Sequence, residues 1–534
     1  MCRLYEKVEV RLAEEVDRVA RYLHHSTLER LTKTCETVMV AQHIDKIQAE
    51  FPSMLTQDKQ DDLRRLYNLL ARIENGLGPL RDIFRNHVRD DGLARIEALN
   101  NVNDDDDDGA AASSSTAAAS KDEKKKRSSK KQEFKSYVET LIAVHDRYWS
   151  LIVNVFAEDN GFAVEMNKAF DHFMNLEGNR SPEYLSLYID DKLKKGAKGV
   201  TEDEKSAIID KCLILFRRIE EKDMFERYYK NHLAKRLLSG RSASNDAERE
   251  VITKLKSECG MSFTHKLEGM FKDVQLSADI MDKFGESELA KNLGITLSVQ
   301  VLTTGFWPQV AGSCILPPEI AKCQEVFKQF YLNSHSGRVL NWQSTQGTAD
   351  LKATFGGKTK EISVSTTQMA ILCLFNQADS MTFTEIRDAT ELDIVALKRD
   401  LLSLACAKYK ILTKEPKSKK IKPDDVFTFN ETFKCKLFKF KIPQVVTKES
   451  SREREVTIRK VDDDRKFKID AAIVRIMKAR KTLDHANLVA AVIKQLKARF
   501  TPNPPVIKKQ IETLIERGYL ERDPKSRKQY NYLA

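Results

Sequence analysis

The hydrophobic residues of this chain recur with the period of an α-helix over most of its first half. Between residues 5 and 99 they are spaced three and four positions apart, as Val8, Leu12 and Val16 show, and the pattern resumes over residues 134–284. Such spacing predicts amphipathic helices that pack on one another. A chain of 534 residues is too long for one hydrophobic core. A mainly α fold with several domains is therefore expected.

A low-complexity segment interrupts the helical pattern at residues 101–132, NVNDDDDDGAAASSSTAAASKDEKKKRSSKKQ. Few of its side chains can join a hydrophobic core, which predicts a disordered surface insertion. Helical domains are expected around it, at residues 1–100, 133–178 and 179–290.

The hydrophobic period changes near residue 295. Leu297, Val299 and Val301 alternate with polar side chains, which is typical of a strand with one buried face. A second strand-rich zone at residues 338–355 contains a turn at Gly347. Together they predict a small sheet in an α/β segment over residues 291–364.

Two further units combine helices with strands, at residues 365–446 and 469–534, and the charged stretch 447–468 predicts a linker between them. In the last unit, helices are expected at 471–481, 486–500 and 505–517, followed by a β-hairpin. This order predicts a helix-turn-helix with a wing, and each unit is interpreted as a winged helix.

Several function classes are disfavoured by the sequence. A glycine-rich phosphate loop, a His-Glu-x-x-His helix and a Gly-x-Ser-x-Gly elbow are all absent. The nearest nucleophile pair, Cys259 with His265, has no evident orienting acid. We therefore expect no catalytic residues and no cofactor.

The cysteines and the apolar runs indicate an intracellular protein without a membrane span. The nine cysteines are scattered and form no Cys-x-x-Cys pair, so neither a disulfide framework nor a metal site is expected. No apolar run approaches the roughly 20 residues that a membrane span needs. The first twenty residues mix acidic and basic side chains, unlike a signal peptide.

The basic C-terminal unit supports an alternative function. Residues 470–534 contain 14 Lys or Arg against 6 Asp or Glu. The helix at 505–517 could lie in a DNA major groove with Lys508, Lys509 and Arg517 on phosphates. Gln510 is its only Asn or Gln, so few base-reading side chains are present. A winged-helix nucleic-acid-binding protein is the alternative interpretation.

The run IVRIMKARK, residues 473–481, contains a candidate modification site. Ile473 and Met477 share one helical face, whereas Lys478 lies about 140° round the helix from Ile473. Lys478 is therefore expected to point to solvent, either as part of an ordinary charged face or as a modification site. The residue pattern alone does not choose Lys478 over Lys481.

This run, with VDDDRKFKIDAA before it, resembles the neddylation segment of cullins, and Lys478 matches the lysine modified in that family. Further stretches resemble cullins: SPEYLSLYIDDKLKKG (181–196), EKDMFERYYKNHLAKRLL (221–238), LKSECGMSFTHKLEGMFKD (255–273), LTTGFWP (302–308) and ERGYLERDPKSRKQYNYLA (516–534). LTKEPKSKKI (412–421) and SPEYLSLYIDD are most similar to the cullins that recruit substrates through BTB-domain adaptors.

The resemblance implies a fold of cullin-repeat helices, a four-helix bundle, a small α/β segment and two winged helices. It implies a non-catalytic scaffold of a ubiquitin ligase complex in the cytoplasm and nucleus, supporting ubiquitin-dependent protein degradation. A RING-box protein would add a strand to the α/β segment and bring a ubiquitin-charged conjugating enzyme. Leu297, Val299 and Val301 are the candidate residues for that strand pairing, with an ordinary internal strand as the alternative. A ubiquitin-like modifier on Lys478 would loosen the last winged helix.

The chain departs from the cullin pattern at its start, because cullins carry earlier helical repeats that bind the adaptor. Direct binding of a BTB adaptor is therefore doubtful at this stage. An incomplete gene model, a fragment, or a natural short form that acts as a RING-box decoy would each explain this difference.

Overall fold

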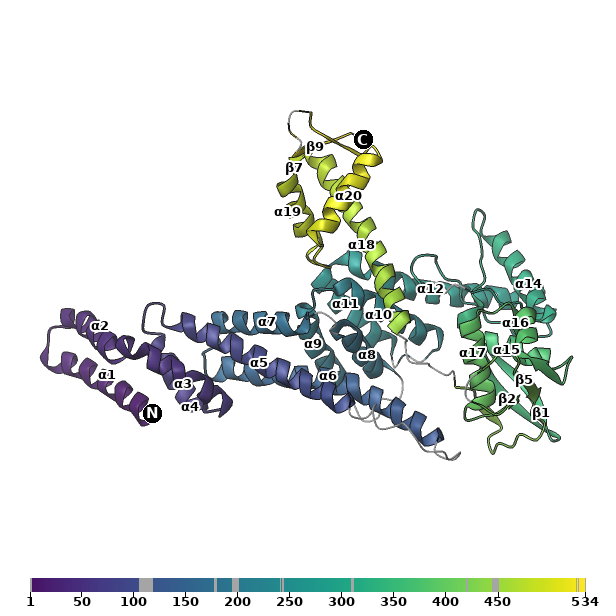
Figure 1. The fold of residues 1–534 in the computed structure, drawn as a ribbon, viewed down its shortest axis with the longest axis horizontal. Coiled ribbons are helices and arrows are strands. Elements are labelled where there is room, and N and C mark those ends of the chain that lie inside the picture. The colour runs from purple at the N-terminus through teal and green to yellow at the C-terminus, as the bar shows by residue number, and fades with distance from the viewer. Residues whose placement is uncertain are drawn as a thin grey trace. The chain divides into compact units, whose positions relative to one another are not determined.

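The computed structural model describes residues 2–104, 119–176, 180–194, 201–240, 242, 244–308, 312–418, 421–443, 451–524, 526 and 528–533. The chain divides into two compact units (Figure 1). The first comprises Met1–Tyr229, Ala243–Cys259 and Lys466–Ala534, and the second comprises Lys230–Ser242 and Gly260–Arg465.

Helices form the N-terminal part of the first unit, so the mainly α prediction is confirmed. They are α1 (Cys2–Tyr22), α2 (Leu28–Met39), α3 (Ile44–Thr56), α4 (Gln60–Leu70), α5 (Leu77–Asp104), α6 (Ala119–Asn154), α7 (Asn160–Met174), α8 (Ser181–Leu193), α9 (Glu202–Arg218), α10 (Lys222–Leu238) and α11 (Asn245–Cys259). Aromatic rings fill their core: Phe156 stacks on Phe162 at 4.3 Å, and Phe84 meets Phe162 edge-on at 5.4 Å. These are the arrangements that aromatic pairs prefer.

The insertion predicted to be disordered is partly helical. Helix α5 continues to Asp104 and α6 begins at Ala119, whereas residues 105–118 lie outside the described residues. Residues 119–132, ASKDEKKKRSSKKQ, are rich in Lys and contain neither Gly nor Pro. Their helix propensity is therefore high even though they offer little to a core.

The second unit begins with α12 (Met261–Glu286), α13 (Glu288–Lys291) and α14 (Pro318–Ser334). Two small sheets follow. The first has the order β1-β2-β6, with β1 (Thr348–Phe355) antiparallel and β6 (Lys439–Lys441) parallel to β2 (Lys358–Ser365). The second is antiparallel in the order β3-β5-β4, from β3 (Ser380–Thr382), β4 (Leu412–Glu415) and β5 (Val426–Phe429).

Both sheets share one hydrophobic core with α15 (Thr366–Leu374), α16 (Phe383–Thr390) and α17 (Ile394–Leu401). Strand β6 follows α15 in the chain but pairs with β2, which precedes it. Residues before and after α15 therefore both contribute to this core.

Two strands predicted from alternation are not strands. Residues 296–303, which include Leu297, Val299 and Val301, are extended but belong to no sheet in the described structure. The same holds for residues 338–342, whereas the alternation that follows them does form β1. Side chains of α12 take the place of a neighbouring strand for the first segment, as shown below.

The predicted linker at 447–468 is helical from Ser451, where α18 (Ser451–Arg480) begins. Its charged residues are spaced for pairing along a helix, as in Arg465 with Asp462 at 3.5 Å. Residues 447–450 lie outside the described residues.

Beyond residue 466, α18 packs with α19 (His485–Leu496) and α20 (Pro504–Glu516) around one core (Figure 1). A sheet of order β7-β9-β8 completes this C-terminal module, from β7 (Thr482–Asp484), β8 (Leu520–Arg522) and β9 (Gln529–Tyr532). The winged-helix assignments and the domain limits stay predictions. Among the described helices, none is both long enough and apolar enough to cross a membrane.

Candidate modification and docking sites

Lys478 lies in the last turn of α18, with its side chain exposed. On the opposite face of this turn, Ile473 and Met477 are fully buried in the core of the C-terminal module. The predicted solvent exposure of Lys478 is thus confirmed. Because the buried face fixes the rotation of the helix, it also fixes the side on which this amine is presented.

Lys481 differs from Lys478 in its surroundings. Its backbone has a φ of 64°, its N–H donates to the Met477 carbonyl at 2.7 Å, and its ammonium lies 5.1 Å from the ring centroid of Tyr532. The Lys478 side chain has no hydrogen bond or ion pair within the described residues. A large group could therefore join Lys478 without breaking a contact, whereas at Lys481 it would disturb the cation–π contact.

Two of the four residues considered for DNA contact, Gln510 and Arg517, are engaged in the fold. The Gln510 side chain is 8% exposed, and its amide donates to Asp470 of α18 at 2.9 Å. Arg517 pairs with the same carboxylate at 3.6 Å. Lys508 and Lys509 remain exposed, so α20 offers charge but not its one amide to a nucleic acid. This geometry disfavours base-specific recognition.

The extended segment 296–303 lies against α12, whose side chains bind its backbone. The N–H of Val299 donates to the Met281 sulfur at 3.3 Å, and that of Val301 donates to Ser277 Oγ at 2.8 Å. The Ser277 hydroxyl also donates to the Val301 carbonyl at 2.9 Å. One edge of the segment is thus satisfied by a helix.

The opposite edge of this segment is open. In an extended chain, successive residues direct their N–H and C=O groups to opposite sides. The backbone groups of Ser298, Gln300 and Leu302 have no hydrogen-bond partner in the part of the chain that the structure describes. Leu297, Val299 and Val301 meanwhile pack into a core of their own with α12 and α14. This side of the segment therefore leaves its backbone groups available for pairing.

A second extended segment contributes to the same core. Leu340 and Trp342 pack there, with the Trp342 ring 6.1 Å from that of Phe327 of α14. Val339, directly before Leu340, is 84% exposed, which is unusual for a valine. Both extended segments are therefore held on one side and exposed on the other.

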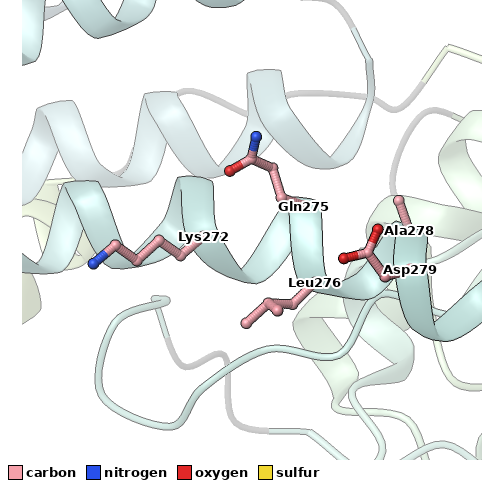
Figure 2. Close-up of a pocket in the computed structure, with 5 residues that line it drawn as sticks. All are labelled: Lys272, Gln275, Leu276, Ala278 and Asp279. Carbon is pink, nitrogen blue, oxygen red and sulfur yellow. The ribbon is translucent and has the colours of Figure 1, made fainter.

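The residues that hold segment 296–303, Ser277 and Met281 above all, were missed at the sequence level. Their only signal was four-residue spacing on a predicted helix, and that spacing does not reveal partners that lie 18 and 24 residues further along the chain. Figure 2 shows another face of the same turns of α12, where Lys272, Gln275, Leu276, Ala278 and Asp279 line a shallow depression. These side chains provide one amine and one carboxylate, with no thiol, hydroxyl or imidazole.

The candidate thiol nucleophile is poorly suited to catalysis. Burial raises the pKa of Cys259 to about 11, and the effect of nearby Lys222, which opposes it, is smaller. Since the thiolate is the reactive form, this thiol is almost entirely protonated at neutral pH.

Comparison with known proteins places these sites in a family. Residues 1–281 match the cullin alpha solenoid domain, residues 301–433 the cullin alpha+beta domain, and residues 464–526 the cullin protein neddylation domain. The last of these matches contains Lys478.

Relatives align over nearly the whole chain. Cullin-3 of Dictyostelium discoideum is 45% identical over 570 residues, covering 99% of this chain and 70% of that protein. Cullin-3A of Arabidopsis thaliana is 46% identical over 99% of this chain and 69% of its own length, and mouse Cullin-4A is 40% identical over 99% and 66%. The BTB-adaptor class inferred from the sequence fits these Cullin-3 relatives. The chain belongs to the cullin family.

Proposed function

We propose that this cullin is the scaffold subunit of a cullin-RING ubiquitin ligase and is activated when a ubiquitin-like protein is attached to Lys478. The observation that carries the proposal is an exposed, unpaired lysine at the end of α18, inside the segment that matches the neddylation domain. The ligase would support ubiquitin-dependent protein degradation in the cytoplasm and nucleus.

The modification requires only a presented amine. The unprotonated Lys478 amine attacks the thioester that links the modifier to its conjugating enzyme. An isopeptide bond forms as the thioester C–S bond breaks, the enzyme cysteine leaves as a thiolate, and the amine loses a proton to solvent. Apart from the Lys478 amine itself, the cullin supplies no reacting group in this step, so its contribution is to position the lysine.

The open edge of segment 296–303 supports the second half of the proposal. A strand from a RING-box protein would pair with the free backbone groups of Ser298, Gln300 and Leu302, adding main-chain hydrogen bonds. The RING-box protein would bring a ubiquitin-charged conjugating enzyme, and the scaffold would hold it near the substrate. Ubiquitin transfer would then be accelerated by proximity. A BTB adaptor would supply the substrate, as the similarity to Cullin-3 proteins supports.

Attachment of the modifier would work as a switch. It adds a folded protein to the end of α18, where the C-terminal module begins. An arrangement of this module that leaves no room for the added protein is then disfavoured, and arrangements that accommodate it gain population.

The test compares the full-length chain with two matched variants, Lys478→Arg and Lys481→Arg. Both substitutions keep the positive charge and remove one amine. Each protein is incubated with the neddylation enzymes and RING-box protein, then analysed by intact mass and peptide mapping. We expect one adduct on Lys478 in the parent and in Lys481→Arg, and none in Lys478→Arg.

An adduct that persists in Lys478→Arg would show that another lysine is the site. A parent chain that binds RING-box protein but accepts no modifier would instead support the decoy function. A chain that binds duplex DNA with a steep salt dependence and ignores RING-box protein would support the nucleic-acid alternative.

A further inference from the structure

Helix α12 contacts the extended segment 296–303 at regular steps of four residues. Asp273, Ser277 and Met281 accept the backbone N–H groups of Thr303, Val301 and Val299, at 2.8, 2.8 and 3.3 Å. The helix positions rise while the segment positions fall, so the two chains run antiparallel. Every second residue of the segment thus finds an acceptor on the helix.

The spacing of the two elements explains why this is possible. Four residues of an α-helix advance about 6 Å along its axis. Two residues of an extended chain advance about 6.6 Å. The mismatch is about 0.6 Å per step, small enough for flexible side chains to absorb over three steps. One face of α12 therefore presents acceptors as a neighbouring β-strand would.

Asp273 fixes one end of this arrangement. Its carboxylate accepts three hydrogen bonds, from the N–H and the hydroxyl of Thr303 and from the Trp307 indole at 2.7 Å. One turn earlier, Gly269 lets the Phe306 ring approach, because a Cβ there would lie 2.5 Å from it. Asp273 itself is 6% exposed, so few water molecules can replace these bonds.

We propose that Asp273 and Ser277 are positioning residues that hold segment 296–303 in its extended form before the partner strand arrives. This inference rests on the proposed pairing of that segment with RING-box protein. A lone extended segment has no sheet to restrain it, and ordering it during binding costs conformational entropy. When the side chains of α12 hold the segment extended, its free backbone groups are in position before the partner strand binds. Only molecules in which the segment is extended can bind, so losing the contacts to α12 reduces the apparent affinity for RING-box protein.

The first experiment measures association and dissociation of RING-box protein with the full-length cullin. Ser277→Ala removes both hydrogen bonds to Val301, the acceptor for its N–H and the donor to its carbonyl, and adds no bulk. We expect its association rate constant to fall by at least roughly fivefold, because each lost hydrogen bond corresponds to about a fivefold change in the population of the formed edge. The dissociation rate constant should change less, because the bound strand then holds the segment.

Asp273 allows a rescue test. Asp273→Ala removes all three bonds and should also slow association. In Asp273→Asn the amide oxygen can accept from the Thr303 N–H and the Trp307 indole, while its NH₂ group donates to the Thr303 hydroxyl. Asp273→Asn should therefore associate at nearly the parental rate. Ser403→Ala is the matched control, because Ser403 is a buried serine in the same unit that donates to the Arg399 carbonyl at 2.9 Å.

Hydrogen exchange separates this inference from the proposed function. In the free parent, the amides of Val301 and Thr303 should exchange slowly and those of Ser298 and Gln300 fast, and the latter should become protected when RING-box protein binds. If they stay unprotected in the complex, the proposed docking edge is wrong. If they become protected while Ser277→Ala and Asp273→Ala associate at the parental rate, the positioning role is refuted. Equal slowing by Ser403→Ala would also refute it, since general destabilisation would then explain the effect.

Discussion

Replacing Asp425 by alanine should open the hairpin of β4 and β5, because Lys414 would lose its counter-charge in the protein interior. The two side chains are 2.9 Å apart and only 2% and 3% exposed. The Lys414 ammonium also donates to the Pro416 carbonyl and to Ser418 Oγ, at 2.9 and 2.7 Å. Asp425 accepts the Lys422 N–H at 2.8 Å. This pair thus holds the loop between the two strands.

The expected cost follows from this environment. Removing one partner of a buried ion pair typically costs about 3–5 kcal/mol. Because Lys414 keeps two oxygen acceptors in Asp425→Ala, we expect the lower end, about 3 kcal/mol. The double variant Lys414→Met/Asp425→Leu removes both charges and leaves mainly the Lys422 N–H unsatisfied, at about 1 kcal/mol. The double variant should therefore be more stable than Asp425→Ala.

Native-state hydrogen exchange of the β4 and β5 amides measures the free energy of opening this hairpin without requiring the whole chain to unfold in two states. Asp425→Ala should lower it by about 3 kcal/mol and the double variant by about 1 kcal/mol. If the two single variants each lowered the opening free energy by less than about 1 kcal/mol, and these losses added up in the double variant, the two residues would not form a buried, coupled pair.

The same pair predicts an acid response. Burial raises the pKa of Asp425, but hydrogen bonds from Lys414 and the Lys422 amide, with the charge of Lys414, outweigh it and lower the pKa overall. A carboxyl with a lowered folded-state pKa contributes stability above its unfolded-state pKa of about 3.9. That contribution is lost as the pH falls below this value. The hairpin should therefore open progressively below about pH 4 in the parent and lack this response in the double variant.

Three further predictions concern other parts of the chain. Met477→Ala should lower the opening free energy of α19 and α20 amides by about 2–4 kcal/mol, since Met477 is fully buried; an unchanged value would contradict the core described here. Gly269→Ala should lower the free energy of opening the turn at residues 303–306 by about 1–3 kcal/mol, because the new Cβ would clash with the Phe306 ring. Hydrogen exchange of the Phe306 amide that stays as slow as in the parent would contradict this prediction. Cys259 should react with iodoacetamide at pH 8 roughly a hundredfold more slowly than free cysteine, and fast labelling in a peptide map would show that its thiol is not shielded.

The sequence was sufficient for the helices and for the presentation of Lys478. Both depend on local periodicity: buried Ile473 and Met477 set the helix face, and Lys478 follows on the other side. The charged stretch before them was predicted only as a linker, without its helix, because its composition suits solvent. A solvated helix has the same composition, and α18 satisfies its backbone internally.

The docking edge could be predicted only in part. Alternation of Leu297, Val299 and Val301 predicted a strand, and of this only the buried side was confirmed, because the segment belongs to no sheet in the described structure. It could not show what binds the backbone, because the alternation of side chains is the same whether the neighbour is a strand or a helix. Ser277 and Asp273 appear in the sequence only as polar residues of a helix, and their role depends on tertiary contacts.

The open edge at Ser298, Gln300 and Leu302 has a consequence for the protein before it meets any partner. Unpaired strand edges are aggregation hazards, and natural proteins usually cover, shorten or charge them. No charged side chain occurs between Ile295 and Trp307. The free chain should therefore self-associate at high concentration, and RING-box protein made alongside it should keep it soluble. For this scaffold, the partner strand would act as a folding chaperone as well as a ligase subunit.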